Sequence, residues 1–208
     1  MFANGVSTTG PSSGGPVPLR ILGIDPGLTR CGYAVIDGSG PNDVAAIALG
    51  VIRTPPSDPL PQRLAALRTE LAALIAEYRP AAVAVEHVFF QVNVRTAMSV
   101  GQASGLALAE AAAAGCDVAQ YTPNQVKDAV AGWGGAPKDQ VQKMVQARLH
   151  LATPPQPPDA ADAAALALCH LAMAPMRQRI DAAVAGGRGA GVIGNSTPPG
   201  STGSGVGQ

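Results

Sequence analysis

Residues 19–37 read LRILGIDPGLTRCGYAVID, and this stretch decides which fold the chain can form. Residues 19–25 are an apolar run that is typical of a buried strand and that ends at Asp25. The turn-forming sequence Asp-Pro-Gly follows, and residues 31–37 form a second strand-like run. We therefore expect two strands that pair as a hairpin, with a carboxylate where the first strand ends.

The patterns that follow predict one more strand and then an alternation of helices and strands. Leu64, Leu67 and Leu71 recur at helical spacing, and Thr122 with Gln125 has the form of a capping box. Strands are predicted at residues 44–54, 81–86 and 116–121, and helices at 60–78, 94–114 and 138–150, after Thr122 and from Asp159 onward. Hairpin-connected strands before an alternating region predict an α/β fold with a five-stranded mixed sheet flanked by helices.

The composition predicts one folded domain between two flexible tails. Residues 1–18 and 180–208 are rich in Gly, Ser and Pro, so the folded domain is expected at residues 19–179. The formal net charge is zero, so no global basic field indicates a nucleic-acid partner. We find three unpatterned cysteines, no signal-peptide pattern and no apolar run of about 20 residues. These features predict reduced thiols and a cytoplasmic protein without a membrane anchor.

Two acidic residues each end an apolar strand. Asp25 also begins a turn, in which Asp is common, and Glu86 could be a solvated strand end or pair with an arginine. If the two strands are parallel neighbours in the mixed sheet, however, Asp25 and Glu86 share one edge of that sheet. Each acid by itself has a local explanation, whereas the pair predicts a common site.

Two further acids, Asp159 and Asp162, open the last helix. Asp159 fits a helix cap, and both acids suit the positive end of the helix dipole, but their spacing also places them on one helical face. Beside Asp25 and Glu86 they would repel one another unless a cation binds, and oxygen ligands favour Mg²⁺ or Mn²⁺. Two such ions about 3.5–4 Å apart form a site that cleaves phosphodiester bonds.

Four blocks of the sequence resemble, in content and in order, the RuvC family of Holliday-junction resolvases: ILGIDPGLTRCGYAVID, VAVEHVFFQVNVRTAMSVGQASG, TPNQVKDAVAGWGGAPKDQVQKMV and PPDAADAAALALCH. The resemblance spans residues 19–173. It implies an RNase H-like fold and a homodimer that makes paired symmetric nicks across a four-way DNA junction in recombination and repair. Metal-activated water would attack the phosphodiester and leave 5′-phosphate and 3′-hydroxyl ends. The resemblance also implies a partnership with the RuvA–RuvB branch-migration complex.

The resemblance assigns roles to individual residues. It implies that the catalytic acids, which bind two Mg²⁺ or Mn²⁺ ions, are Asp25, Glu86, Asp159 and Asp162. It implies DNA contacts at Phe89, which would stack on a base, at Arg95, which opens a helix, and at Lys127 and Lys138, which flank a Gly-rich loop.

These DNA contacts have ordinary structural alternatives. Phe89 could instead pack into the core, and either lysine could be a solvated surface residue. Ser104 stands where members of the family often carry Arg, which removes one expected basic contact. We expect Trp133, in the Gly-rich loop, to cover the core.

Two other functions compete with the nuclease. The sequence DPGLT has the Asp-x-Gly-x-Thr form of a phosphate loop in actin-like and sugar-kinase ATP-binding enzymes. Those proteins need two such lobes, and the sequence shows no second phosphate loop. A non-catalytic junction-binding protein is the other alternative, but four carboxylates would repel DNA phosphates unless a metal ion were bound.

Overall fold

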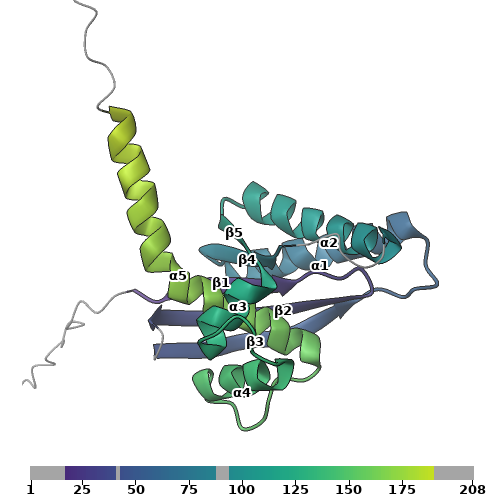
Figure 1. The fold of residues 1–208 in the computed structure, drawn as a ribbon. Helices are drawn as coiled ribbons and strands as arrows, with labels where there is room; N and C mark the ends of the chain where they lie inside the picture. Colours follow the sequence, from purple (N-terminus) through teal and green to yellow (C-terminus); the bar gives the residue numbers. More distant parts are fainter. Residues whose placement is uncertain (1–16, 41–42, 88–93, 190–208) are drawn as a thin grey trace, which may run out of the picture. The chain divides into compact units, whose positions relative to one another are not determined.

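The five strands form one mixed sheet in the computed structural model, which describes residues 17–40, 43–87 and 94–189 (Figure 1). The strands are β1 (Leu19–Asp25), β2 (Arg30–Gly40), β3 (Asp43–Arg53), β4 (Ala82–Glu86) and β5 (Asp117–Tyr121). Their order across the sheet is β3-β2-β1-β4-β5. Strands β1, β2 and β3 pair antiparallel, whereas β4 lies parallel to both β1 and β5. The predicted five-stranded mixed sheet is confirmed.

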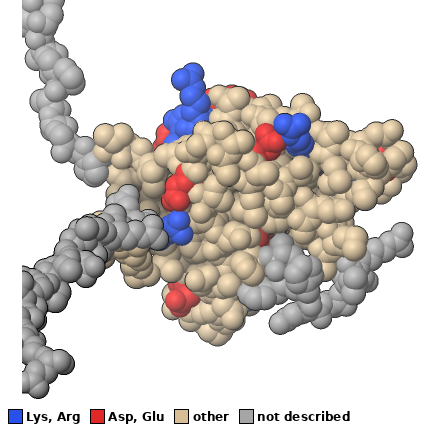
Figure 2. Space-filling model, turned by 90° about the horizontal axis from the view of Figure 1, so that it is seen from above, with Lys and Arg blue, Asp and Glu red and all other residues tan. Residues whose placement is uncertain are grey.

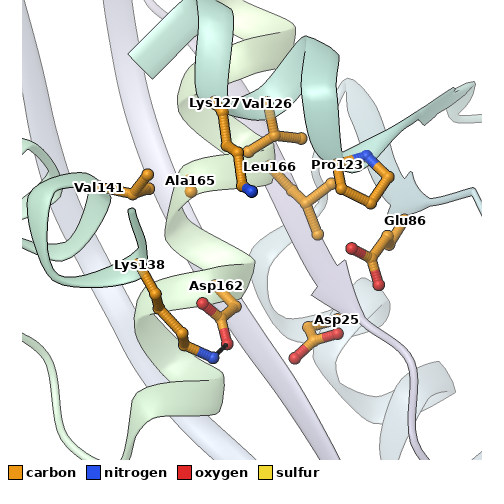
Figure 3. A pocket seen from close by; sticks show the side chains of 10 residues that line it. All are labelled: Asp25, Glu86, Pro123, Val126, Lys127, Lys138, Val141, Asp162, Ala165 and Leu166. Atoms are coloured by element: carbon orange, nitrogen blue, oxygen red, sulfur yellow. Dashed lines mark hydrogen bonds and ion pairs between the residues drawn. The ribbon is translucent and has the colours of Figure 1, made fainter. Parts of the chain in front are cut away.

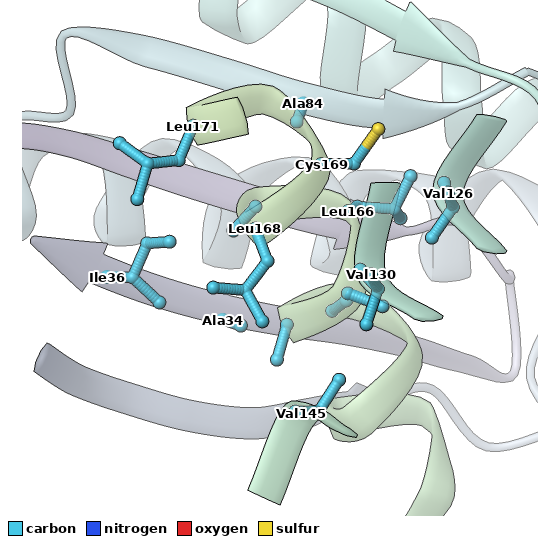
Figure 4. Packing of buried hydrophobic residues seen from close by; sticks show 14 of the residues in the cluster. Ala34, Ile36, Ala84, Val126, Val130, Val145, Leu166, Leu168, Cys169 and Leu171 are labelled. Carbon is cyan, nitrogen blue, oxygen red and sulfur yellow. The ribbon is translucent and has the colours of Figure 1, made fainter. Parts of the chain in front are cut away.

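Helices cover both faces of this sheet, as predicted. They are α1 (Leu60–Tyr78), α2 (Val94–Ala113), α3 (Pro123–Ala131), α4 (Lys138–Arg148) and α5 (Pro158–Gly189). Alternate residues of β1 face opposite sides, so Leu22 joins the apolar cluster of α1 and α2, whereas Ile21 joins the cluster of α3, α4 and α5. Figure 4 shows the second cluster, in which Leu168 of α5 lies near Ile36 and Ala34 of β2.

Two glycines allow α5 to lie directly on the sheet. A Cβ atom at Gly23 of β1 would collide with the carbonyl oxygen of Ala163, and one at Gly32 of β2 would collide with that of Asp159. Only a residue without a side chain fits at such a close approach of two backbones. These contacts hold the first turns of α5 against the end of β1, where Asp25 lies.

The contacts of the chain divide it into residues 1–174 and 175–208. The first unit contains the sheet. In the second, α5 continues to Gly189, beyond the predicted domain end at residue 179. The domain limits of 1–18, 19–179 and 180–208 stay predictions. None of the described helices has the length and apolarity that crossing a membrane would require.

Candidate active site

The structure places Asp25 and Glu86 at the same edge of the sheet. Ile24 of β1 pairs with Val85 of β4 in parallel register, and each strand ends at the next residue, which is Asp25 or Glu86. Both side chains are partly buried. Each acid directly follows four buried strand residues. The register of β1 and β4 agrees with the expectation that Asp25 and Glu86 share one edge of the sheet.

A cavity of about 430 Å³ opens beside this edge. Figure 3 shows the carboxylates of Asp25, Glu86 and Asp162 around it, together with the side chains of Lys127 and of Lys138, which contacts Asp162. Its apolar walls come from α3, α4 and α5, through Pro123, Val126, Val141, Ala165 and Leu166. Three of the four predicted acids and both predicted lysines thus line one cavity.

The fourth predicted acid, Asp159, lies outside the lining and binds Arg30 of β2. The guanidinium donates from Nη2 to Oδ2 of Asp159 at 2.5 Å and from Nε to the same oxygen at 3.1 Å. Asp159 is not the helix cap, since α5 already begins at Pro158. Arg30 was missed in the sequence, where nothing local marks it as the partner of a residue so distant in the chain.

Lys138 lies at the first position of α4 and donates a hydrogen bond from Nζ to Oδ2 of Asp162 at 2.6 Å. This ion pair raises the pKa of Lys138, so the ammonium stays charged. The predicted phosphate-binding lysine therefore also contacts one of the predicted metal ligands.

The carboxyl groups have unequal electrostatic surroundings. Burial raises the pKa of Asp25 from 3.8 to about 7, and repulsion from Glu86, Asp162 and Asp159 adds to the rise. Burial likewise raises the pKa of Glu86, with repulsion from Asp162 as the second cause. The pKa of Asp159 is lowered instead, chiefly because Arg30 donates hydrogen bonds to it. Negative charge at the sheet edge is therefore least compensated at Asp25.

The donors at this edge fit a hard divalent cation. Within residues 17–40, 43–87 and 94–189, no three or more His, Cys, Asp or Glu side chains already stand in the arrangement of a metal site. Two of the four acids contact basic side chains instead, Asp159 with Arg30 and Asp162 with Lys138. The available donors are nevertheless all carboxylate oxygens, which are the ligands that such a cation prefers. Burial chiefly raises the pKa of Asp25, and repulsion from the neighbouring acids, which a cation would offset, adds to the rise.

The two remaining predicted DNA contacts and two other residues named from the sequence have different outcomes. Phe89 lies outside the described residues, as does the side chain of Arg95. Ser104 is buried on α2. Trp133 does not cover the core as predicted, because 52% of its surface is exposed.

Charged side chains are sparse on the face of the molecule that Figure 2 shows, and basic groups there lie beside acidic ones. The described part of that face carries no broad basic surface. At the cavity, too, the two lysines lie among three carboxylates, and Lys138 forms an ion pair with Asp162.

Comparisons with known proteins all identify similarity to the same family. A family model described as crossover junction endodeoxyribonuclease RuvC matches residues 21–170. A protein of that description from Salinispora arenicola is 53% identical over 165 residues, which cover 79% of this chain and 94% of the relative.

Solved structures agree with the family model. Thermus thermophilus RuvC in complex with a Holliday junction substrate is 38% identical, with a TM-score of 0.73 and coverage of 76% of this chain and 96% of that chain. The yeast mitochondrial Holliday junction resolvase Ydc2 is similar in fold, with 16% identity, a TM-score of 0.56 and coverage of 74% and 79%.

Proposed function

The chain belongs to the RuvC family of crossover junction endodeoxyribonucleases, and from this premise we infer that it is an endonuclease that resolves four-way DNA junctions. Its fold is the RNase H-like α/β fold that the sequence predicts. The observation that carries the inference is the cavity lined by Asp25, Glu86 and Asp162, inside the matched region. The ATP-binding and non-catalytic alternatives are not favoured by this match.

The cation would be held by the carboxylates at the sheet edge. Asp25, Glu86 and Asp162 line the cavity, and Asp159 would join them after leaving Arg30, which is a sufficient set for two ions. Mg²⁺ is the expected ion and Mn²⁺ is an alternative with the same ligand preference. When bound, such ions lower the pKa of water and stabilise the charge of the leaving oxygen in phosphodiester hydrolysis.

The lysines have a separate task, which is to hold the DNA backbone at the cavity. Lys127 and Lys138 present their ammonium groups from α3 and α4 on the side opposite Asp25 and Glu86 (Figure 3). A phosphate between the two groups would be attracted by the lysines, although the carboxylates alone would repel it. Contacts of this kind position the backbone without reading its sequence. Phe89 and Arg95 remain proposed contacts to the junction.

Paired cuts need two active sites related by symmetry. A four-way junction is resolved when two opposed strands are nicked, so we assign the chain a two-fold symmetric homodimer. We also assign it a cytoplasmic place of action beside the RuvA–RuvB complex. The products would carry 5′-phosphate and 3′-hydroxyl ends.

The direct test is the nicking of a synthetic four-way junction in the presence of Mg²⁺. We expect Asp25→Asn and Asp162→Asn to lower nicking by more than about 100-fold, beyond the 10- to 100-fold losses typical of changing only a partner of a metal ligand. Glu70→Gln, an exposed acid on α1, is the matched control and should cut like the wild type. Undiminished cutting by Asp25→Asn, or equal cutting of a linear duplex, would contradict the assignment.

A further inference from the structure

The loop between α3 and α4, residues 132–137, lies at the rim of the candidate active site. Helix α3 lines the cavity through Pro123 and Lys127, and α4 lines it from its first residue, Lys138. The loop also folds back on α3, because a Cβ atom at Gly134 would lie 3.4 Å from the carbonyl oxygen of Asn124, the neighbour of Pro123. The loop is therefore next to residues that line the cavity.

The loop exposes the single tryptophan of the chain. Trp133 is 52% exposed, although the loop itself is anchored by Ala136, which is fully buried. The carbonyl oxygen of Trp133 accepts a hydrogen bond from the amide of Ala136 at 3.2 Å, which closes a tight turn. The indole ring is thus carried by a short, anchored loop.

Gly135 determines how the indole is presented. A Cβ atom at Gly135 would collide with the six-membered ring of Trp133, so the ring rests on the backbone of its own loop. Backbone supports the ring on one side, while half of its surface remains accessible. A single exposed apolar residue is ordinary in proteins, so position and surroundings must decide whether it binds anything.

The surroundings favour a nucleotide over an apolar partner. Lys127 and Lys138 lie six residues before and five residues after Trp133 in the chain and both line the cavity, so the loop that carries the indole connects two lysines of the candidate active site. Aromatic rings combined with basic groups that follow a backbone are the general means of binding unpaired nucleotides.

We propose that Trp133 stacks on a base of the junction strand that enters the active site. This inference rests on the proposed function and adds a DNA-contacting residue to it. Stacking would orient the nucleotide beside the scissile phosphate, while the lysines hold that phosphate. Trp133 is a positioning residue in this scheme, since it touches the DNA but not the reacting atoms.

The sole tryptophan provides the test, because its fluorescence reports on one site. The full chain is titrated with an unlabelled four-way junction in EDTA, which prevents cutting, and binding is measured in parallel by the anisotropy of a dye-labelled junction. We expect the tryptophan emission to be quenched with the same midpoint as the anisotropy change. Trp133→Ala should bind the junction about 5- to 150-fold more weakly, the range that corresponds to the loss of one stacked base.

Two further variants make the result specific. Trp133→Phe keeps an aromatic ring and should recover most of the affinity lost in Trp133→Ala. Ile47→Ala removes an exposed apolar side chain from β3 and should bind like the wild type. Circular dichroism verifies that each variant is folded. If Trp133→Ala does not fold, the quenching of the wild-type tryptophan emission by the junction is the deciding measurement.

The outcomes separate the two proposals. If the junction binds and is nicked, yet the emission is unchanged and Trp133→Ala binds normally, the role of Trp133 is refuted and the nuclease assignment stands. If the junction is neither bound nor nicked, the proposed function fails and the inference with it.

Discussion

At the scale of single residues, only two of the four acids have an ion-pair partner among the basic side chains that the structure describes. Asp159 has the guanidinium of Arg30, and Asp162 has the ammonium of Lys138, at 2.5 and 2.6 Å. Asp25 is the most deeply enclosed of the group, and burial, more than any neighbour, raises its pKa. The folded protein therefore holds a carboxyl group that favours a proton in the absence of a metal ion.

The pKa of Asp25 predicts how stability changes with pH. The value rises from 3.8 in the unfolded chain to about 7 in the folded protein, so the folded state binds this proton more tightly. Its stabilising contribution is present below about pH 4 and is lost as the pH rises to about 7, by about 4 kcal/mol at most.

Chemical denaturation in EDTA at a series of pH values measures this contribution. The comparison is the free energy of unfolding of the wild type minus that of Asp25→Asn, which removes the titrating group and cancels the effects of other residues. We expect the difference to fall across this range. A difference that does not change with pH would show that Asp25 titrates normally.

Arg30 predicts a competition for Asp159. The ion pair must break before Asp159 can bind a cation, and solvent-exposed pairs of this kind are weak. Arg30→Gln should therefore lower the half-saturating Mg²⁺ or Mn²⁺ concentration by up to about five-fold, as measured by calorimetry. Arg30→Lys keeps the charge and should change it less. Weaker cation binding by Arg30→Gln would mean that Arg30 orients Asp159 for the ion instead of withholding it.

At the scale of elements, the position of α5 depends on the two glycines beneath it. Gly32 of β2 faces the carbonyl oxygen of Asp159, so any side chain at residue 32 must push the start of α5 away from the sheet. That displacement moves Asp159 and, one turn later, Asp162. The contact between Gly32 and the backbone of Asp159 therefore determines both how α5 packs on the sheet and where its two acids lie.

Gly32→Ala should destabilise the protein by about 1–3 kcal/mol, the usual range for inserting a methyl group into a filled space. Nicking of the four-way junction should fall even under conditions in which the variant remains folded. Gly40→Ala on the same strand is the matched control, because nothing lies within 4 Å of its added Cβ. Thermal unfolding and nicking measured together separate the two effects, and a destabilised variant with normal nicking would refute the link.

At the scale of the whole molecule, the sequence was sufficient to predict the strands and helices and the edge of the sheet at which Asp25 and Glu86 lie. Periodicity and turn residues predicted every strand and helix of the described chain, and the capping box at Thr122 is formed. The pairing of Arg30 with Asp159 was not predictable, because it joins residues 129 apart that only the finished fold brings together. Trp133 was misjudged for a related reason. Apolar character suggests burial, but the loop is already anchored by Ala136, which leaves the indole exposed.

The cation should stabilise the whole molecule, since it binds the folded state and relieves repulsion among carboxylates that unfolding would separate. At ten times its dissociation constant, a bound ion adds about 1.4 kcal/mol, which raises the melting temperature of a protein of this size by about 3–6 °C. Asp25→Asn should be more stable than the wild type in EDTA at pH 8, because the buried charge is gone, and should gain little from Mg²⁺. Glu70→Gln should respond like the wild type. The measurement is the melting temperature of the three proteins with and without Mg²⁺. Equal increases in all three would place the cation elsewhere. An increase that is lost only in Asp25→Asn would show that the carboxylate required by the proposed chemistry also links cation binding to the stability of the fold.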